Sequence, residues 1–407
     1  MRKMRLRHFG ATGLCIALLL CLGARPAAAQ VNARLLLVSG SAVPSHPGFT
    51  FGPFQDLAMS GNDRIVFRST LASPRSNLQA VVRSQGVSFT VVAFEGLISP
   101  ASHEQYESFS APSINSAGDV AFKAKLKAEE ADKPTEAIVC IKGSAAGLVA
   151  DNGGGGNSFG QIFKEFSAPV MGSQGEVLFA ARSGGPNPHS GLYIWSGGGM
   201  RQVSLPKDFR LAPSSLLEPI FASHDEAVFV RHGADLAEAR EQFFRAVATR
   251  TFQQLNPAPQ PPDTVQVLPA RSNQKPIQML LVLLQGNNAE TAELSGDPSQ
   301  PVMAQKAPGA SDNAAFSAIQ GQAAGRISGS IIFAGEPSGQ ADDFGLFCFC
   351  GGQVVRLTTP SDFGLLLNKL GGRPITSFAG DGQGTVALVA PVGAQAGATA
   401  IFVCDTP

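Results

Sequence analysis

Residues 109–122 read Phe109-Ser-Ala-Pro-Ser-Ile-Asn115-Ser-Ala-Gly118-Asp-Val-Ala-Phe122, and this stretch decides the fold. It recurs as Phe166-Ser-Ala-Pro-Val-Met-Gly172-Ser-Gln-Gly175-Glu-Val-Leu-Phe179. Asn and Gly tolerate the left-handed backbone that a tight hairpin turn requires. The residues after the turn are mainly apolar, as expected of a half-buried strand. Each stretch therefore predicts two strands joined by a tight turn.

Looser copies of this unit occur along the whole chain. Together with the two clear copies they end at seven apolar anchor residues, which lie 50 to 57 residues apart: Phe67, Phe122, Phe179, Phe229, Leu280, Phe333 and Leu388. In four of the looser copies the Asn and Gly positions are taken by Ser60/Asp63, Asn273/Pro276, Arg326/Gly329 and Asp381/Gly384. Self-similarity at such a period is the signature of a repeat architecture.

Each unit contains about four predicted strands. A second apolar strand follows the anchor, as at Ala137–Cys140 and Leu192–Trp195, and a third follows a glycine turn such as Gly351-Gly352. Four-stranded units repeated four to eight times around an axis define a β-propeller. We therefore predict an all-β fold, a seven-bladed β-propeller domain over residues 30–407. A ring of six or eight blades and a pair of β-sandwiches are the alternatives.

The two ends of the repeat region complement each other. The seventh unit stops after its third strand, and Arg34–Val38 has the pattern of a fourth strand. An open ring would leave unpaired strand edges, which proteins avoid. We therefore predict that Arg34–Val38 pairs with the last strand, near Phe402, and closes the ring.

Residues 1–29 have the composition of a secretory signal peptide. Four basic residues precede the apolar run Leu14–Leu22, and Ala27-Ala28-Ala29 supplies the small residues of a cleavage site. The apolar run is shorter than the roughly 20 residues that span a bilayer. We expect cleavage after Ala29, no membrane span afterwards, and a periplasmic or secreted bacterial protein.

The charges argue against two classes of partner. The signal region holds five of the 31 basic residues and no acidic ones, so residues 30–407 carry 26 basic against 31 acidic groups, a net charge of −5. No basic cluster occurs along the sequence, which argues against nucleic acid and anionic membranes. No cofactor-binding or metal-binding pattern occurs, and we expect a monomer without a cofactor.

The Asn115-x-x-Gly118-x-x-x-Phe122 unit resembles the tandem NxxGxxxF repeats of uncharacterised secreted bacterial proteins. The resemblance covers most of residues 31–407. It implies export and a repeat architecture, and it transfers no catalytic residue to this chain.

A ligand site is expected on one face of the ring. Alternating strand directions place the tight turns on one face and the long connections on the other. Loops on a rigid scaffold usually carry function, so the candidate ligand-binding residues are the polar and aromatic ones of the long connections: His103, Glu104, Tyr106, Asp132, His189, Asp208 and Arg210.

Two further motifs carry chemistry in other proteins. Gly156-Asn-Ser158-Phe-Gly160 matches a nucleophile elbow, but it lacks the preceding strand and following helix that the elbow needs, so we read it as a glycine loop. Four cysteines follow the signal, without CxxC spacing. In an oxidising compartment a disulfide from Cys404 to Cys348 or Cys350 is one interpretation, and free thiols are the other.

The sequence therefore favours an exported binding module whose long connections engage a glycan, peptide or protein. A hydrolase or lyase acting on an extracellular polymer is the rival, because propeller enzymes assemble their sites from several blades. A scaffold of the cell envelope is a third interpretation.

Overall fold

The computed structural model describes a chain made of antiparallel β-strands. The described residues are 32–61, 63–127, 135–153, 162–184, 190–197, 199–203, 216–223, 226–231, 242–247, 252–254, 264–269, 279–285, 288–295, 302–303, 316–324, 331–337, 345–350, 353–358, 375–381, 384–392 and 397–405. The proposed signal peptide lies outside them. Among the described residues, no helix is long and apolar enough to span a membrane.

Four sheets follow one another in the first part of the chain. The first sheet contains β2 (Thr50–Ser60), β3 (Arg64–Ala72), β4 (Asn77–Gln85) and β5 (Ser88–Phe94). The second contains β6 (Gln105–Phe109), β7 (Ser113–Ile114), β8 (Val120–Lys127), β9 (Glu136–Lys142) and β10 (Ala145–Asp151). The third contains β11 (Phe163–Phe166), β12 (Val170–Met171), β13 (Val177–Ser183), β14 (Ser190–Ser196) and β15 (Gly199–Val203). The fourth contains β16 (Leu216–Ser223), β17 (Glu226–Arg231), β18 (Gln242–Val247) and β19 (Phe252–Gln254).

The remaining strands form two more sheets. The eight-stranded sheet contains β20 (Thr264–Pro269), β21 (Met279–Gln285), β22 (Asn288–Ser295), β23 (Val302–Met303), β24 (Phe316–Ala324), β25 (Ile331–Pro337), β26 (Gly345–Cys350) and β27 (Gln353–Arg356). Its two halves meet through one residue pair, Ala289 with Phe316. The terminal sheet contains β28 (Ser377–Gly380), β29 (Thr385–Pro391), β30 (Thr399–Asp405) and β1 (Asn32–Val38).

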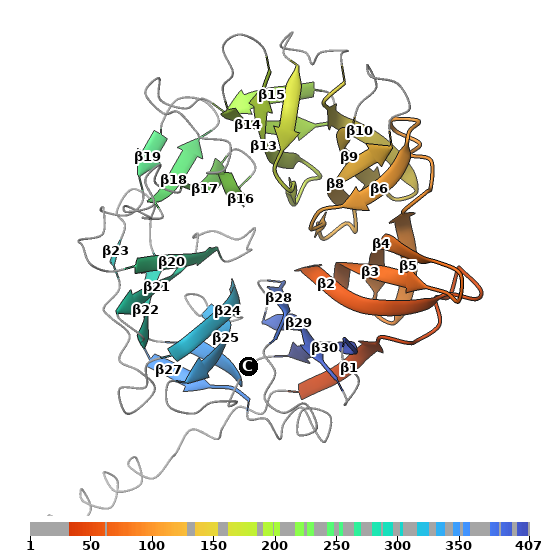
Figure 1. Cartoon of the computed structure of the whole chain (residues 1–407). Helices are drawn as coiled ribbons and strands as arrows, with labels where there is room; N and C mark the ends of the chain where they lie inside the picture. Colours follow the sequence, from red (N-terminus) through yellow and green to blue (C-terminus); the bar gives the residue numbers. More distant parts are fainter. Residues whose placement is uncertain are drawn as a thin grey trace, which may run out of the picture.

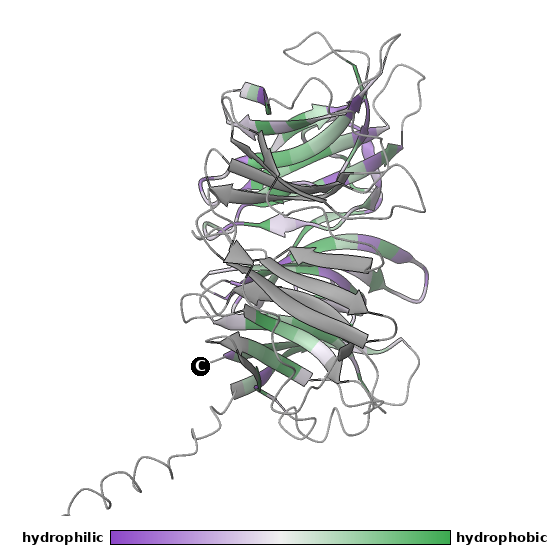
Figure 2. Ribbon diagram, turned by 90° about the vertical axis from the view of Figure 1, so that its left-hand side faces the viewer, coloured by the Kyte–Doolittle hydropathy of each residue, from purple (hydrophilic) through white to green (hydrophobic). Residues whose placement is uncertain are grey.

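The sheets stand around a common axis, which is the arrangement of a β-propeller (Figure 1). The strands next to the axis include β2, β16, β24 and β28. Neighbouring sheets touch through these strands, as in the contacts of β2 with β28 and of β12 with β16. Seen from the side, apolar residues follow the strands and hydrophilic residues gather toward the strand ends (Figure 2).

The anchor residues of the repeat form the core between sheets. Five of them are described with their side chains and have 0 % exposure: Phe67, Phe122, Phe179, Phe333 and Leu388. Phe67 packs with residues of the terminal sheet, and Phe122 packs with residues of the first sheet. The apolar anchor is therefore required because each sheet is covered on its faces by the neighbouring sheets.

The predicted pairing of Arg34–Val38 with the last strand is present. Strand β1 pairs antiparallel with β30, and Leu35 lies opposite Phe402. Ser39 and Thr399 exchange two hydrogen bonds, since the amide of Ser39 donates to the Thr399 carbonyl and the Thr399 amide donates to Ser39 Oγ. Thr399 Oγ1 also accepts a hydrogen bond of 2.9 Å from the amide of Phe54 in the first sheet. The first and last described segments are thus joined side by side.

The Asn-x-x-Gly turn has a defined geometry. The Asn115 side chain is buried; its Oδ1 accepts from the Asp119 amide at 2.9 Å, and its Nδ2 donates to Asp119 Oδ2 at 3.1 Å. Gly118 has φ +86° and donates its amide to the Asn115 carbonyl. Glycine adopts this left-handed conformation without a steric penalty.

The same turn is built in other copies with different residues. Asp381 Oδ1 accepts from the Thr385 amide at 3.0 Å, and Gly384 has a positive φ. In the first copy Asp63 takes the glycine position with φ 54°. The carboxylate oxygen of Asp381 therefore accepts the same backbone hydrogen bond, from the amide four residues later, as the amide oxygen of Asn115.

Three of the outermost strands, β1, β5 and β10, carry a bulge. The register shifts between Leu35 and Leu37 in β1, opposite Val81 and Val82 in β5, and between Leu148 and Ala150 in β10. A bulge twists an exposed strand edge and hinders its pairing with another chain. These three outer strands are thereby protected against edge-to-edge association.

Of the two interpretations for Cys404, a disulfide to Cys348 or Cys350 is not formed in the structure, and the free thiol is present. Cys404 is a free, buried thiol, whereas Cys348 is disulfide-bonded. Cys404 lies on β30 inside the apolar layer between the eight-stranded and terminal sheets, and no other described cysteine belongs to that layer. Its neighbours there are side chains such as Leu388 and Phe402, which leave it no thiol to bond.

Candidate functional site

Two faces of the molecule follow from the strand directions. The turn face consists of the tight connections at residues 61–63, 86–87, 115–119, 143–144 and 172–176. The long-loop face consists of residues 39–49, 73–76 and 95–104, with residues 152–153 and 162 at the described ends of the next connection. A polar network in the middle of the strands belongs to neither face.

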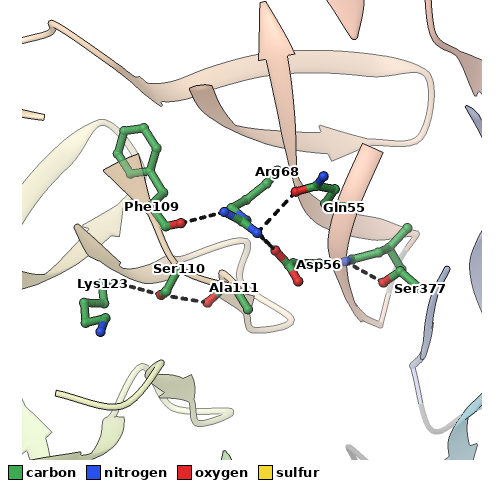
Figure 3. Close-up of polar contacts among 9 residues, drawn as sticks. Gln55, Asp56, Arg68, Phe109, Ser110, Ala111, Lys123 and Ser377 are labelled. Carbon is green, nitrogen blue, oxygen red and sulfur yellow. Dashed lines mark hydrogen bonds and ion pairs between the residues drawn. The ribbon is translucent and has the colours of Figure 1, made fainter. Parts of the chain in front are cut away.

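That network joins the first and second sheets near the axis (Figure 3). Arg68 forms an ion pair with Asp56, and its Nη1 donates to the Phe109 carbonyl of the second sheet at 2.8 Å. Its Nη2 donates to Gln55 Oε1 at 3.3 Å. Asp56 has φ 49°, a strained conformation for a non-glycine residue.

The same device recurs one sheet later. Lys123, the residue after the anchor Phe122, donates its ammonium to the Phe166 carbonyl of the third sheet at 2.9 Å and lies 3.6 Å from Glu136 Oε1. Arg68 has the same position after Phe67. Because these cations bond to the backbone of the next sheet, they hold sheets together, and we assign them a structural role.

The repeated Phe-Ser-Ala-Pro sequence is also structural. Ser110 Oγ accepts from the Lys123 amide at 3.1 Å and donates to the Ala111 carbonyl, as Figure 3 shows. Ser167 forms the equivalent pair of bonds with Ala180 and Ala168. The serine hydroxyl satisfies a backbone amide where the inner strand bends before proline, which lacks an amide hydrogen.

The connection at residues 95–104 is a rigid structure on the long-loop face. Its backbone bonds to itself, since the Ser99 amide donates to the Glu104 carbonyl and the His103 amide donates to the Ser99 carbonyl, both at 2.8 Å. Ser99 Oγ is buried and accepts from the amides of Ala101 and Ser102. Ile98 is 58 % exposed and bridges Gln105 in an isolated ladder pair. The connection thus holds an exposed apolar side chain in a fixed position.

His103 is exposed and has φ 63°. This left-handed conformation favours glycine or asparagine, and a residue kept there against that preference marks a position to be tested for function. Two other described non-glycine residues have positive φ, and both already have a structural role: Asp63 in the tight turn and Asp56 beside Arg68.

The connection at residues 39–49 meets the end of β5, just before the 95–104 connection. The ring of His46 lies edge-on to the ring of Phe94, with centroids 5.3 Å apart and planes at 80°. Ser45 Oγ lies 2.9 Å from His46 Nδ1. The imidazole of His46 and the phenyl ring of Phe94 therefore lie together where the 39–49 connection meets the first sheet.

The predicted site residues have different outcomes. His103 and Glu104 lie on the long-loop face, where Glu104 is half-buried and His103 exposed. Tyr106 is a correction: it is 2 % exposed and packs with Phe109 and Phe122, because it lies on β6 facing the core. Burial raises the pKa of its phenol, which also bonds to the Ser99 side chain. The other predicted residues, Asp132, His189, Asp208 and Arg210, lie outside the described residues.

Sequence reasoning missed Ile98, Ile162 and His46 on this face. Ile162 is 41 % exposed, and its carbonyl accepts from the Gly184 amide. Ile98 could have been found from the sequence, because it is an apolar residue that lies outside the apolar pattern of the strands. The contact of His46 with Phe94 could not be read from residues 48 positions apart.

The described residues offer no evident metal or nucleophile site. No group of three or more His, Cys, Asp or Glu side chains among them could hold a metal ion. Asn152 Oδ1 accepts from the amides of Thr135 and Glu136 at 2.8 Å. Burial raises the pKa of the Cys140 thiol to about 11, so this cysteine is a poor nucleophile.

Comparisons with known proteins add little about chemistry. A family model described as a family of unknown function (DUF7453) matches residues 27–206. No curated protein matches the chain.

Among solved structures, a mutant of the Aleuria aurantia lectin bound to Fucα1-6GlcNAc is 10% identical, with 76% of this chain and 95% of that chain covered and a TM-score of 0.36. AofleA from Arthrobotrys oligospora is 11% identical, with coverages of 80% and 90% and a TM-score of 0.36. The Dos1 propeller is 7% identical, with coverages of 87% and 79% and a TM-score of 0.43. At these values the likeness does not bear on the ligand.

Proposed function

We propose that this chain is an exported seven-bladed β-propeller that binds an extracellular ligand through its long-loop face. The signal peptide is cleaved after Ala29, and the domain of seven repeats extends over residues 30–407 in the periplasm or outside the cell. The ligand is a glycan, a peptide or a protein, and the protein acts as a binding module.

The repeat supports the count of seven blades. The first four sheets and the terminal sheet each correspond to one unit, and the eight-stranded sheet corresponds to two units joined by one residue pair. The pairing of β1 with β30 supplies the fourth strand of the seventh blade. Such a ring leaves no sheet face without a neighbour, which is the physical advantage of closure.

One observation carries the binding proposal. The 95–104 connection satisfies its backbone hydrogen bonds internally, yet it holds Ile98 exposed and His103 in a left-handed conformation. A rigid loop loses little conformational entropy when a ligand binds, so it favours recognition. The inner network of Arg68 and Lys123, by contrast, is engaged between sheets.

A thermal-shift panel of envelope glycans, peptides and secreted proteins tests this function. We expect a ligand that stabilises the wild type and Val87→Asp but not Ile98→Asp. Val87 is the matched control, because it is 78 % exposed in the same sheet but on the turn face. A ligand that stabilises Ile98→Asp and the wild type equally would show that binding occurs elsewhere, and a silent panel would favour a scaffold.

A further inference from the structure

The turn face gathers cations that are far apart in the sequence. Arg64 Nη1 donates to the Ser116 carbonyl at 2.7 Å, and Arg83 Nη1 donates to the Gly118 carbonyl at 2.8 Å. Two arginines of the first sheet therefore converge on one turn of the second sheet. A Cβ atom at Gly118 would lie 3.0 Å from Arg64 Nη1, so both guanidinium groups border the same glycine.

A third cation continues this row toward the third sheet. Arg83 Nη1 also lies 3.5 Å from the carbonyl of Gly143, the residue after Lys142. The exposed Lys142 ammonium is 5.2 Å from the ring centroid of Trp195, and a Cβ atom at Gly175 would lie 3.0 Å from it. We call Arg64, Arg83 and Lys142 the cation row; it crosses two sheet boundaries.

The cation row lacks carboxylate partners. Among the residues that the structure describes, none of its three members forms an ion pair, whereas Arg34 pairs with Asp63 at 2.8 Å on the same face. The carboxylate of Asp119 is close by: a Cβ atom at Gly175 would lie 3.5 Å from its Oδ2, which also accepts from Asn115, so one negative charge lies beside the three cations. Arg64 Nε is buried without a hydrogen-bond partner.

Access to the row is open at the turns. A Cβ atom at Gly143 would meet no atom within 4 Å. The turn is therefore open at Gly143, the residue that follows Lys142 and whose carbonyl lies near Arg83. The Asp119 carboxylate offsets only part of the charge of these three cations, and their guanidinium and ammonium groups retain donors for an anion.

We propose that the cation row is a second binding site, for a linear anionic polysaccharide. Three cations from the first and second sheets, the last of them beside Trp195 of the third sheet, match acidic groups that repeat along an extended chain better than one small anion. Carboxylate and sulfate groups fit the fork of an arginine in the same way. The site lies on the face opposite to the proposed ligand face, so it goes beyond the proposed function.

Heparin and polygalacturonate are the probes, with dextran as the uncharged control, and binding is followed by the fluorescence of Trp195, the only tryptophan. We expect both polyanions to bind and to change this fluorescence, and salt to weaken the binding. Lys142→Gln and Arg83→Gln should each lower the affinity roughly tenfold, as for the loss of a charge-assisted bond. Lys125→Gln and Lys127→Gln remove exposed charges at the other end of β8 and should change it less than about twofold.

If the Lys125 and Lys127 variants lose as much affinity for the polyanions as the Lys142 and Arg83 variants, binding depends only on net charge and the proposed site is overturned. Double-stranded DNA that binds as tightly as the polysaccharides, with the same dependence on Lys142, would overturn the ligand class. Ile98→Asp should leave polyanion binding unchanged, so failure of this site and failure of the long-loop site are separable. Lys142 is exposed, so Lys142→Gln tests the site even if an arginine variant is unstable.

Discussion

Asn115→Ala tests the turn that defines the repeat. The substitution removes the acceptor of the Asp119 amide and the donor to Asp119 Oδ2 at a side chain that is 1 % exposed. Leaving a buried polar group without its partner costs about 1–3 kcal/mol. Unfolding entropy near 2.1 cal/mol/K per residue gives roughly 0.8 kcal/mol/K for a domain of about 380 residues, so a loss of about 2 kcal/mol lowers Tm by about 2–3 °C.

Differential scanning calorimetry of the mature protein measures this shift. Ser116→Ala is the control, because Ser116 is exposed and only its carbonyl is used, by Arg64. We expect the control to melt within about 0.5 kcal/mol of the wild type. An Asn115→Ala protein as stable as Ser116→Ala would refute the assignment of the turn to the Asn115 side chain.

The other predictions concern the joints between sheets and the buried thiols. Arg68→Ala should cost about 1–3 kcal/mol in chemical denaturation, because the Phe109 carbonyl and Asp56 lose their partner; Arg75→Ala, in an exposed loop, should be neutral, and equal effects would contradict the role of Arg68 as a joint. Phe122→Ala should cost about 3–5 kcal/mol, since the ring is fully buried, and a loss below about 1 kcal/mol would argue against the anchor. Burial raises the pKa of Cys140 to about 11 and of Cys404 to about 12, so both thiols should resist a thiol reagent at pH 8 until the protein unfolds. Because these pKa values are raised in the folded state above the ordinary 9.0, their contribution to stability is complete below about pH 9 and is lost as the pH rises toward 11–12; alkaline denaturation that is unchanged in Cys140→Ala would contradict this linkage.

Much of the fold could be predicted because its physics is local and repeated. The apolar anchors such as Phe67 and Phe122, the left-handed glycine at Gly118 and the pairing of Leu35 with Phe402 all follow from patterns within one unit or from the need to close a sheet edge. The strand Leu192–Trp195, predicted from its apolar residues, lies within β14.

The site was harder to predict because it depends on directions and distances between units. Tyr106 was read as a loop residue, but the strand β6 begins before it and turns the ring into the core. Cys404 and Cys348 lie in neighbouring units, yet the packing of Cys404 depends on which layer its side chain enters. The cation row was invisible because Arg64, Arg83 and Lys142 come together only when the first, second and third sheets stand side by side.

Closure of the ring by β1 and β30 is tested most directly by a disulfide between Asn32→Cys and Asp405→Cys. These two residues face each other at the end of the ladder. If the strands pair, the double variant oxidises spontaneously, and a chain cut once by a protease stays in one piece until it is reduced. The pair Asn32→Cys with Ser196→Cys, in the third sheet, should stay reduced. Free thiols at 32 and 405 in the folded protein, or equal cross-linking of the control pair, would contradict the closed ring.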